Sequence, residues 1–257
     1  MKGEIGTIKN VDCMEHMKHV NSGSVDLIIA DPPYFEICGE FDYKYDSEEE
    51  YLEWIKDCII EFNRILNQTG TLILWSGVGC KKIMMAKIAV MIENMGLFKI
   101  KNWVTQRNTR GIGTKRNYMS AREDFLFLTK TDDYTFNVPY TEEKSNRKDL
   151  GANGKPRKNT YKRVSNVWTD ITEASQSSKE RFKLSDGTSF PTVKAQKLCD
   201  RIILTHSNEN DLVYIPFAGS GSEIVSCERN NRKWLASEIN SRYIDEIIQK
   251  RLADLNI

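Results

Sequence analysis

The sequence of 257 residues contains no run of about eighteen consecutive apolar residues, the length that a membrane-spanning helix needs. Its first residues, Met1 to Glu4, also lack the apolar core of a secretory signal peptide. We therefore expect no membrane partner and a cytoplasmic location.

Cysteine pairs and phosphate-binding loops are missing as well. The six cysteines lie scattered at positions 13, 38, 58, 80, 199 and 227, without a CxxC pair and without a histidine beside them. Because zinc sites and disulfide scaffolds need such groupings, we expect neither a metal nor a disulfide framework. No GxxxxGK[ST] segment occurs, so a loop that holds the phosphates of a nucleoside triphosphate is not supported.

The whole chain also lacks a large net charge, because it has 37 basic and 36 acidic side chains. This balance hides an asymmetry. Residues 99–163 hold 16 Lys and Arg against 7 Asp and Glu, a net charge of +9, and the remainder has a net charge of −8. A basic segment of this kind is either a solvated face or a surface that binds a polyanion, and the second interpretation predicts nucleic acid.

Short apolar strands alternate with helical patterns along the chain. The patterns predict strands at 25–30, 71–75, 98–105, 125–129, 211–217 and 234–239, and helices at 48–66, 81–95, 193–205, 223–229 and 241–255. This alternation indicates an α/β fold with a mostly parallel sheet and helices on both faces. Residues 132–189 are polar and lack periodic apolar positions, which predicts a loop-rich insertion.

The first chemical motif is Asp31-Pro32-Pro33-Tyr34, directly after the predicted strand 25–30. Ligands of open α/β sheets bind outside the carboxyl ends of the strands. The motif therefore presents a carboxylate, a rigid turn and an aromatic ring together at a candidate site. A proline turn that merely ends the strand is the alternative interpretation.

The second motif is Phe217-Ala218-Gly219-Ser220-Gly221, at the end of the predicted strand 211–217. Glycines at such a turn permit positive φ angles and let a ligand approach the backbone. Glu238 ends the next strand, at the spacing where a carboxylate binds ribose hydroxyls in nucleotide sites. A tight turn without a ligand would also account for the glycines.

In this order the two motifs resemble those of the β-class amino-methyltransferases of DNA, in which a circular permutation places the catalytic motif before the glycine motif. Val11-Asp12-Cys13-Met14 and residues 208–221 share the resemblance, and residues 102–105 and 111–116 resemble the small MboII-like adenine methylases in particular. The resemblance implies a Rossmann-like fold that uses S-adenosylmethionine (AdoMet). It also implies a catalytic half at 1–130, a candidate target-recognition region at 131–189 and an AdoMet-binding half at 190–257.

The resemblance further implies that the methyl group goes to N6 of a flipped-out adenine in double-stranded DNA. Asp31 and the Pro32 carbonyl can accept the two N6–H bonds, Pro33 completes the turn, and Tyr34 can stack on the flipped base. The expected AdoMet-binding residues are Asp12, Cys13, Asp31, Thr192, Lys194, Phe217, Ala218, Gly219, Ser220, Gly221 and Glu238. The basic middle supplies the candidate DNA contacts Arg107, Arg110, Lys115, Arg116, Arg157, Lys158, Lys162 and Arg163.

Two departures from the family pattern keep alternatives open. Ile215 stands where the family has an acidic residue, and Phe190 stands where it has a histidine. One alternative is a methyltransferase for cytosine N4, although such enzymes more often carry Ser at the position of Asp31. Another is a DNA-binding subunit with impaired cofactor binding. We expect a homodimer, because small members of the family commonly pair. A restriction endonuclease is a candidate partner if the protein serves a restriction-modification system; an orphan or phage methylase would have none.

Overall fold

The structure is a computed structural model that describes residues 6–36, 45–78, 82–113, 115–145, 160–172 and 181–255, with the backbone alone at 109, 110 and 112. The strands of its main sheet are β1 (Thr7–Asn10), β2 (Val25–Ala30), β3 (Leu66–Ser76), β4 (Lys99–Ile112), β5 (Ser120–Thr129), β8 (Val167–Trp168), β9 (Leu212–Ile215) and β10 (Lys233–Glu238). The helices are α1 (Cys13–Met17), α2 (Glu48–Ile65), α3 (Met84–Met95), α4 (Gln196–His206), α5 (Ser222–Arg229), α6 (Ser241–Tyr243), the π-helix η2 (Ile244–Ile248) and α7 (Gln249–Ala253). Within these ranges, no helix combines the length and the apolar character needed to cross a membrane.

The main sheet is mostly parallel. Its strand order is β1-β10-β9-β2-β3-β5-β4-β8, and β5 runs antiparallel to both of its neighbours. In the centre β2 pairs with β9, with Leu27 opposite Val213 and Ile28 opposite Tyr214. From this pair the chain continues from β2 to β3 in one direction and from β9 to β10 in the other. The β2–β9 boundary is therefore the topological switch point, where open α/β sheets bind their ligands.

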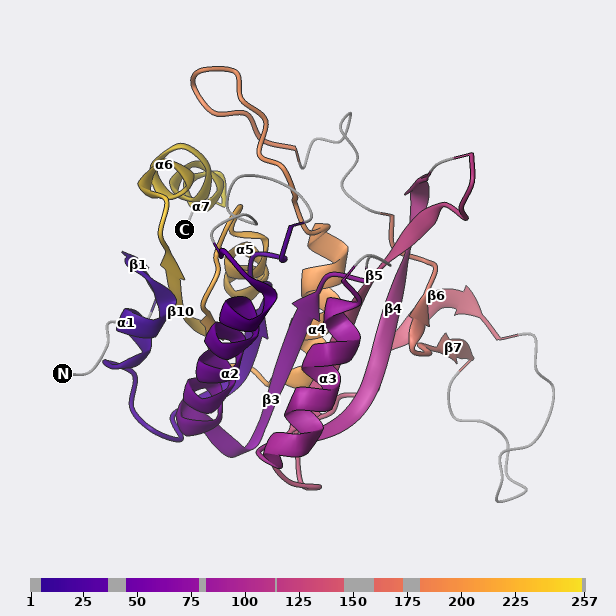
Figure 1. The fold of residues 1–257 in the computed structure, drawn as a ribbon, viewed down its shortest axis with the longest axis horizontal. Helices are drawn as coiled ribbons and strands as arrows, with labels where there is room; N and C mark the ends of the chain where they lie inside the picture. The colour runs from indigo at the N-terminus through magenta and orange to yellow at the C-terminus, as the bar shows by residue number, and fades with distance from the viewer. Residues whose placement is uncertain are drawn as a thin grey trace.

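Helices cover both faces of the sheet, as predicted. In Figure 1, α2 and α3 lie in front of the strands, and α4 and α5 lie behind them. The front core joins α1, α2 and α3 to side chains such as Ile28 of β2. The rear core joins α4, α5 and η2 to Leu27 and Ile29 of the same strand. Adjacent residues of β2 thus enter opposite cores, which explains why its sequence is a continuous apolar run.

Several predicted boundaries were wrong. The helix α2 passes directly into β3 at Leu66, although Asn67 to Gly70 suggested a loop. The segment predicted as one final helix is divided into α6, η2 and α7, and β1 and α1 were not expected. Most importantly, β4 and β5 are far longer than their apolar segments, because their polar outer halves pair with each other.

The described part of residues 132–189 contains strands as well as loops. β6 (Tyr140–Lys144) pairs antiparallel with β7 (Tyr161–Arg163) in a separate two-stranded sheet. β8 pairs with β4, with Thr105 opposite Val167, and extends the main sheet by one short strand. This region therefore joins the main sheet at the edge beside β4.

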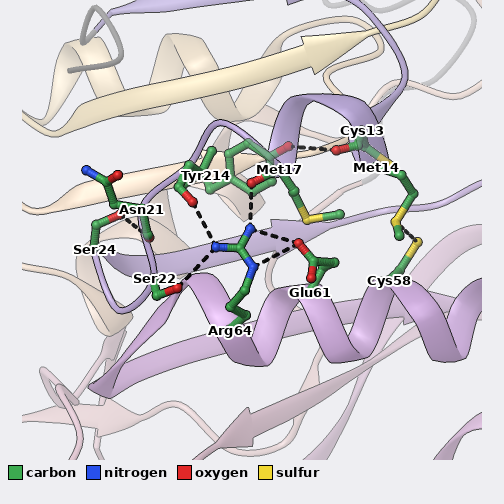
Figure 2. Close-up of polar contacts among 11 residues, drawn as sticks. Cys13, Met14, Met17, Asn21, Ser22, Ser24, Cys58, Glu61, Arg64 and Tyr214 are labelled. Carbon is green, nitrogen blue, oxygen red and sulfur yellow. Dashed lines mark hydrogen bonds and ion pairs between the residues drawn. The ribbon is translucent and has the colours of Figure 1, made fainter. Parts of the chain in front are cut away.

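Arg64, near the end of α2, fixes the end of α1 (Figure 2). One guanidinium nitrogen donates to the Met17 carbonyl at 2.6 Å, and another donates to the Val20 carbonyl at 2.9 Å. Glu61 pairs with the same guanidinium at 2.8 Å. Carbonyls at a helix end need such donors. At its other end α1 begins at Asp12, whose carboxylate caps the first turn, so Arg64 helps to position the turn that carries Asp12.

Replacing Arg64 by Met keeps an apolar stem but removes the guanidinium donors from both carbonyls, while Met17 still accepts the Val20 N–H. We expect Arg64→Met to lower the free energy of unfolding by about 1–3 kcal/mol, measured by urea denaturation. Lys56→Met on the same helix is the control, because Lys56 makes only an exposed pair with Glu53 and should change stability little. Equal unfolding curves for the two variants would contradict the role given to Arg64.

Candidate active site

Both sequence motifs lie at the carboxyl edge of the switch point. Asp31 directly follows β2, and Pro216 directly follows β9, the strand beside it. The parallel pairing of the two strands makes their ends adjacent, although the motifs lie far apart in the sequence. The edge therefore combines the carboxylate of the first motif with the glycine turn of the second.

Asp31 is held by one hydrogen bond and one ion pair. The Tyr34 hydroxyl donates to Oδ1 at 2.7 Å, and Lys194 Nζ lies 3.1 Å from Oδ2. Lys194 Nζ also donates to Glu123 Oε2 at 2.8 Å and lies 5.2 Å from the ring centroid of Trp75. Side chains from the ends of β2 and β3, from β5 and from the segment before α4 thus converge on one point.

The charges in this cluster are coupled. Only 10% of the Lys194 side chain is exposed. Burial alone would lower the pKa of Lys194, but the carboxylates of Asp31 and Glu123 outweigh it and hold that pKa well above its ordinary value. Burial and the adjacent Asp31 charge raise the pKa of Tyr34 well above its ordinary value. Asp31 therefore forms an ion pair with a charged ammonium and accepts a hydrogen bond from a neutral phenol.

Neighbouring elements brace the backbone that carries these groups. Tyr51 of α2 donates its hydroxyl to the Pro33 carbonyl at 2.9 Å, which holds the proline turn against the helix. Ser222 at the start of α5 donates to the Lys194 carbonyl at 2.9 Å. Arg251 of α7 in turn donates to the Ser222 hydroxyl at 3.1 Å. The two halves of the cluster are thus tied to helices on opposite faces of the sheet.

The glycine turn is joined to the end of β10 through Glu238. The Gly219 N–H donates to one carboxylate oxygen of Glu238 at 2.8 Å, and the Asn240 N–H donates to the other at 2.9 Å. Burial raises the pKa of Glu238, and the backbone donors oppose that rise. Gly219 has a φ of +50°, and a Cβ there would lie 3.2 Å from the Phe190 ring. Phe190 therefore covers one side of the turn, where the family resemblance led us to expect a histidine.

The second glycine of the turn, Gly221, is required for a different reason. Gly221 has a φ of +74°, and a Cβ there would lie 3.0 Å from Ile248 of η2. Its absent side chain lets the C-terminal helical segment pack closely behind the turn. Ile215, the other departure from the family pattern, is fully buried in the rear core, where a carboxylate would need a partner.

The structure brings some of the other predicted cofactor residues to this edge. Asp12 and Cys13 follow β1, and β1 pairs with β10 so that Asn10 lies opposite Glu238. Thr192 is exposed. Lys194, which we expected beside the methionine carboxylate, is paired with Asp31 in this structure, so that expected contact stays a prediction.

Five of the eight predicted DNA contacts are described with their side chains, and all five are exposed: Arg107 on β4, Lys115 and Arg116 in the turn between β4 and β5, and Lys162 and Arg163 on β7. Lys162 pairs with Glu143 at 2.5 Å. The Arg110 side chain, Arg157 and Lys158 lie outside the described part of the chain.

Sequence reasoning missed Glu123 and Arg251. Glu123 lies in a stretch of β5 that we did not predict as strand, so nothing indicated that its side chain would meet Lys194. Arg251 lies in a predicted helix, but nothing in the sequence indicates that its side chain would hydrogen-bond to Ser220 and Ser222 at the glycine turn. Their contacts depend on pairings that only the folded chain shows.

Comparison with known proteins identifies the family. The family model for DNA methylases of the N6/N4 type matches residues 25–250, which is most of the chain. The chain belongs to the N6/N4 DNA methylase family. It is similar to the type II methyltransferase M.HpaI of Haemophilus parainfluenzae, with 30% identity over 94% of this chain and 72% of the relative. It is also 30% identical to the DNA adenine methyltransferase YhdJ of Escherichia coli K12, over 94% of this chain and 81% of the relative.

Solved structures share the fold. The cytosine-N4-specific PvuII DNA methyltransferase superposes with a TM-score of 0.72 at 16% identity, covering 97% of this chain and 90% of that one. M1.HpyAVI superposes with a TM-score of 0.64 at 22% identity, covering 96% and 98%. A complex of M1.HpyAVI with AdoMet matches with a TM-score of 0.60. These superpositions confirm the expected Rossmann-like methyltransferase fold. As a member of the N6/N4 family, the protein is an AdoMet-dependent DNA methyltransferase.

The edge at the switch point has the features that AdoMet requires. Gly219 itself adds no side chain to the turn, although Phe190 covers one side of it, and the buried Glu238 carboxylate is fixed by two backbone donors and retains lone pairs for hydroxyl groups. Among the described residues, no group of His, Cys, Asp and Glu is arranged to hold a metal ion. The glycine turn and the Glu238 carboxylate are the features that fit the organic cofactor.

Gly219→Val tests the glycine turn. The positive φ and the 3.2 Å approach to Phe190 mean that a side chain must displace either the turn or the ring. We expect AdoMet affinity, measured by calorimetry, to fall by at least about tenfold, because a displacement costing about 1.4 kcal/mol suffices. Gly219→Ala should give a smaller loss and keeps the test valid if the Val variant does not fold. Unchanged affinity in both folded variants would exclude this turn from the AdoMet site.

Proposed function

We propose that this enzyme transfers the methyl group of AdoMet to N6 of a flipped-out adenine at a specific sequence in double-stranded DNA. The observation that carries the proposal is the Asp31 carboxylate at the end of β2, held by Tyr34 and Lys194 beside the glycine turn. The similarity to an adenine methyltransferase of Escherichia coli supports the choice of adenine. So does Asp31 itself, since cytosine-N4 enzymes of the resembling family more often carry Ser there.

The proposed mechanism depends on hydrogen bonding to the amino group. Adenine N6 is a weak nucleophile because its lone pair is delocalised into the ring. The Asp31 carboxylate accepts one N6–H bond and the Pro32 carbonyl accepts the other, which directs the nitrogen lone pair out of the ring plane. Bound AdoMet supplies an electrophilic methyl group on a sulfonium sulfur. Lys194 and Tyr34 fix the carboxylate in place, and positioning and electrostatics account for most of the rate enhancement.

Other residues of the edge have proposed binding roles. The turn from Phe217 to Gly221 contacts the methionine part of AdoMet, and Glu238 accepts hydrogen bonds from the ribose. Asp12 and Cys13 lie toward the adenine end, and Thr192 lies near the methionine carboxylate. Tyr34 stacks on the flipped base, and its hydrogen bond to Asp31 keeps its ring beside the carboxylate.

The proposal extends to the organisation of the chain. Residues 1–130 form the catalytic half, 131–189 the target-recognition region and 190–257 the AdoMet-binding half, in the permuted order of the β class. The protein forms a homodimer, as small enzymes of this class commonly do. Type II methyltransferases among its relatives also suggest a cognate restriction endonuclease that acts on the same site.

Methylation of mixed-sequence duplex DNA with labelled AdoMet, followed by nucleoside analysis, tests the proposal. We expect the label in N6-methyldeoxyadenosine. Label in N4-methyldeoxycytidine would overturn the choice of base, and the absence of labelled nucleoside would overturn the activity. Asp31→Ala should lower kcat roughly a hundred- to a thousandfold, as the loss of one preorganised hydrogen-bonding group does elsewhere. Asp57→Ala, which changes an exposed carboxylate of α2, is the control and should retain full activity.

AdoMet affinity separates a catalytic role of Asp31 from a structural one. If Asp31→Ala still binds AdoMet but no longer methylates DNA, the carboxylate acts on the methyl transfer. A near-normal rate for Asp31→Ala would rule out the proposed mechanism.

The basic residues between β4 and β5 lead to a prediction about DNA binding. Reversing Lys115 and Arg116 to Glu should weaken binding to every duplex sequence and flatten its salt dependence, because each lost phosphate contact removes about 0.9 from the slope. Reversing Lys9 and Lys233, which are exposed near the opposite edge of the sheet, is the matched control. Equal affinities and salt slopes for the two double variants would show that the duplex does not lie on the β4–β5 side.

A further inference from the structure

The β4–β5 hairpin extends beyond the carboxyl edge of the sheet. β3 ends at Ser76, which pairs with Asp124 of β5, whereas β5 itself begins at Ser120. In Figure 1 the hairpin rises past the end of β3 on the same side as the catalytic edge. Its tip lies at residues 113–119, of which Thr114 is outside the described part of the chain. Where their side chains are described, the outer residues of the hairpin belong to neither apolar core.

The described tip combines apolar and basic side chains that are all exposed. Tyr118 is 95% exposed, more than any other large apolar side chain in the described residues, and Met119 is 68% exposed. Lys115 and Arg116 are exposed beside them. A fully exposed tyrosine next to an exposed methionine costs solvation free energy unless a partner covers both. The adjacent cations favour a partner that is a polyanion.

The base of the same hairpin belongs to the catalytic cluster. Glu123 binds Lys194 at 2.8 Å, and Lys194 lies 3.1 Å from Asp31. Tyr118 precedes Glu123 by five residues, so at about 3.3 Å per residue their Cα atoms are at most about 17 Å apart. A two-stranded ribbon fits the major groove of DNA, which is about 12 Å wide. A duplex that delivers a base to Asp31 therefore lies within reach of the hairpin tip.

We propose that Tyr118, together with Met119, inserts into the duplex and occupies the space that the flipped adenine leaves. This inference rests on the proposed function, because it needs a base outside the stack. Flipping removes stacking and pairing from the duplex, and an inserted aromatic or apolar side chain restores part of the lost stacking. Lys115 and Arg116 hold the flanking phosphates and so aim the ring at the gap.

The test compares variants on two forms of one duplex oligonucleotide. The oligonucleotide carries the methylation site, mapped first on plasmid DNA that the wild-type enzyme has modified. In one form the target adenine is paired normally; in the other it faces an abasic position, where flipping breaks no base pair. The variants are Tyr118→Ala, Tyr118→Phe and, as the control, Val90→Ala, which shortens an exposed apolar side chain on α3.

We expect Tyr118→Ala to lower kcat/KM on the paired duplex by roughly ten- to a hundredfold, the range of a lost base–aromatic stack. Most of this loss should disappear on the abasic form, because flipping costs least where the base is unpaired. Tyr118→Phe retains the ring and should stay near the wild-type rate on both forms. Val90→Ala should match the wild type throughout.

Two results would overturn the inference while leaving the methyltransferase activity intact. Tyr118→Ala could match the wild type on the paired duplex, or it could lose the same factor on both forms, which would make Tyr118 a binding contact without a role in flipping. If the wild-type enzyme methylates neither plasmid nor oligonucleotide, the proposed function fails first, and this is apparent before any variant is compared.

Discussion

The parallel pairing of β2 with β9 is the constraint on which the rest of the structure depends. Asp26 lies at the start of this pair, where its carboxylate accepts the Leu212 N–H at 2.7 Å across 186 residues of sequence. Closing so long a loop has an entropy cost, which the apolar cores on the two faces of the sheet offset. Because the pairing is parallel, both strands end at the same edge, and the carboxylate and the glycine turn become neighbours.

A second constraint follows from burying a cation at that edge. Lys194 is almost enclosed, so its ammonium needs carboxylates within hydrogen-bonding distance. Asp31 follows β2 and Glu123 lies on β5, with β3 between them in the sheet. The ammonium also lies over the ring of Trp75, from β3, which adds a cation–π contact. The Asp31 carboxylate and the base of the β4–β5 hairpin are consequently parts of one electrostatic unit.

These two constraints explain how much the sequence could predict. The strand before Asp31, the glycine turn and Glu238 were predictable, because local patterns of apolar residues, prolines and glycines encode them. The extended halves of β4 and β5 were not, because they are polar on both faces and gain their strand conformation only by pairing with each other. The partners of Lys194 were hidden for the same reason, since Glu123 comes to the site through that unpredicted part of β5. The family resemblance supplied the cofactor and the substrate class, which no local pattern could specify.

The distribution of charge over the fold has a final consequence for DNA recognition. The described strands of the basic segment, β4, β5, β6 and β7, lie together on one side of the molecule in Figure 1, whereas β1 and α1 lie on the other. In our proposal this asymmetry orients the duplex before any base is read, because attraction to phosphates carries no sequence information. Sequence must then be read by side chains that enter a groove. The β4–β5 hairpin and the region around β6 and β7 are the described elements that project from the basic side. Our proposal therefore assigns specificity to the part of the chain whose structure the sequence patterns predicted least, because polar ribbons at a sheet edge carry no local apolar pattern.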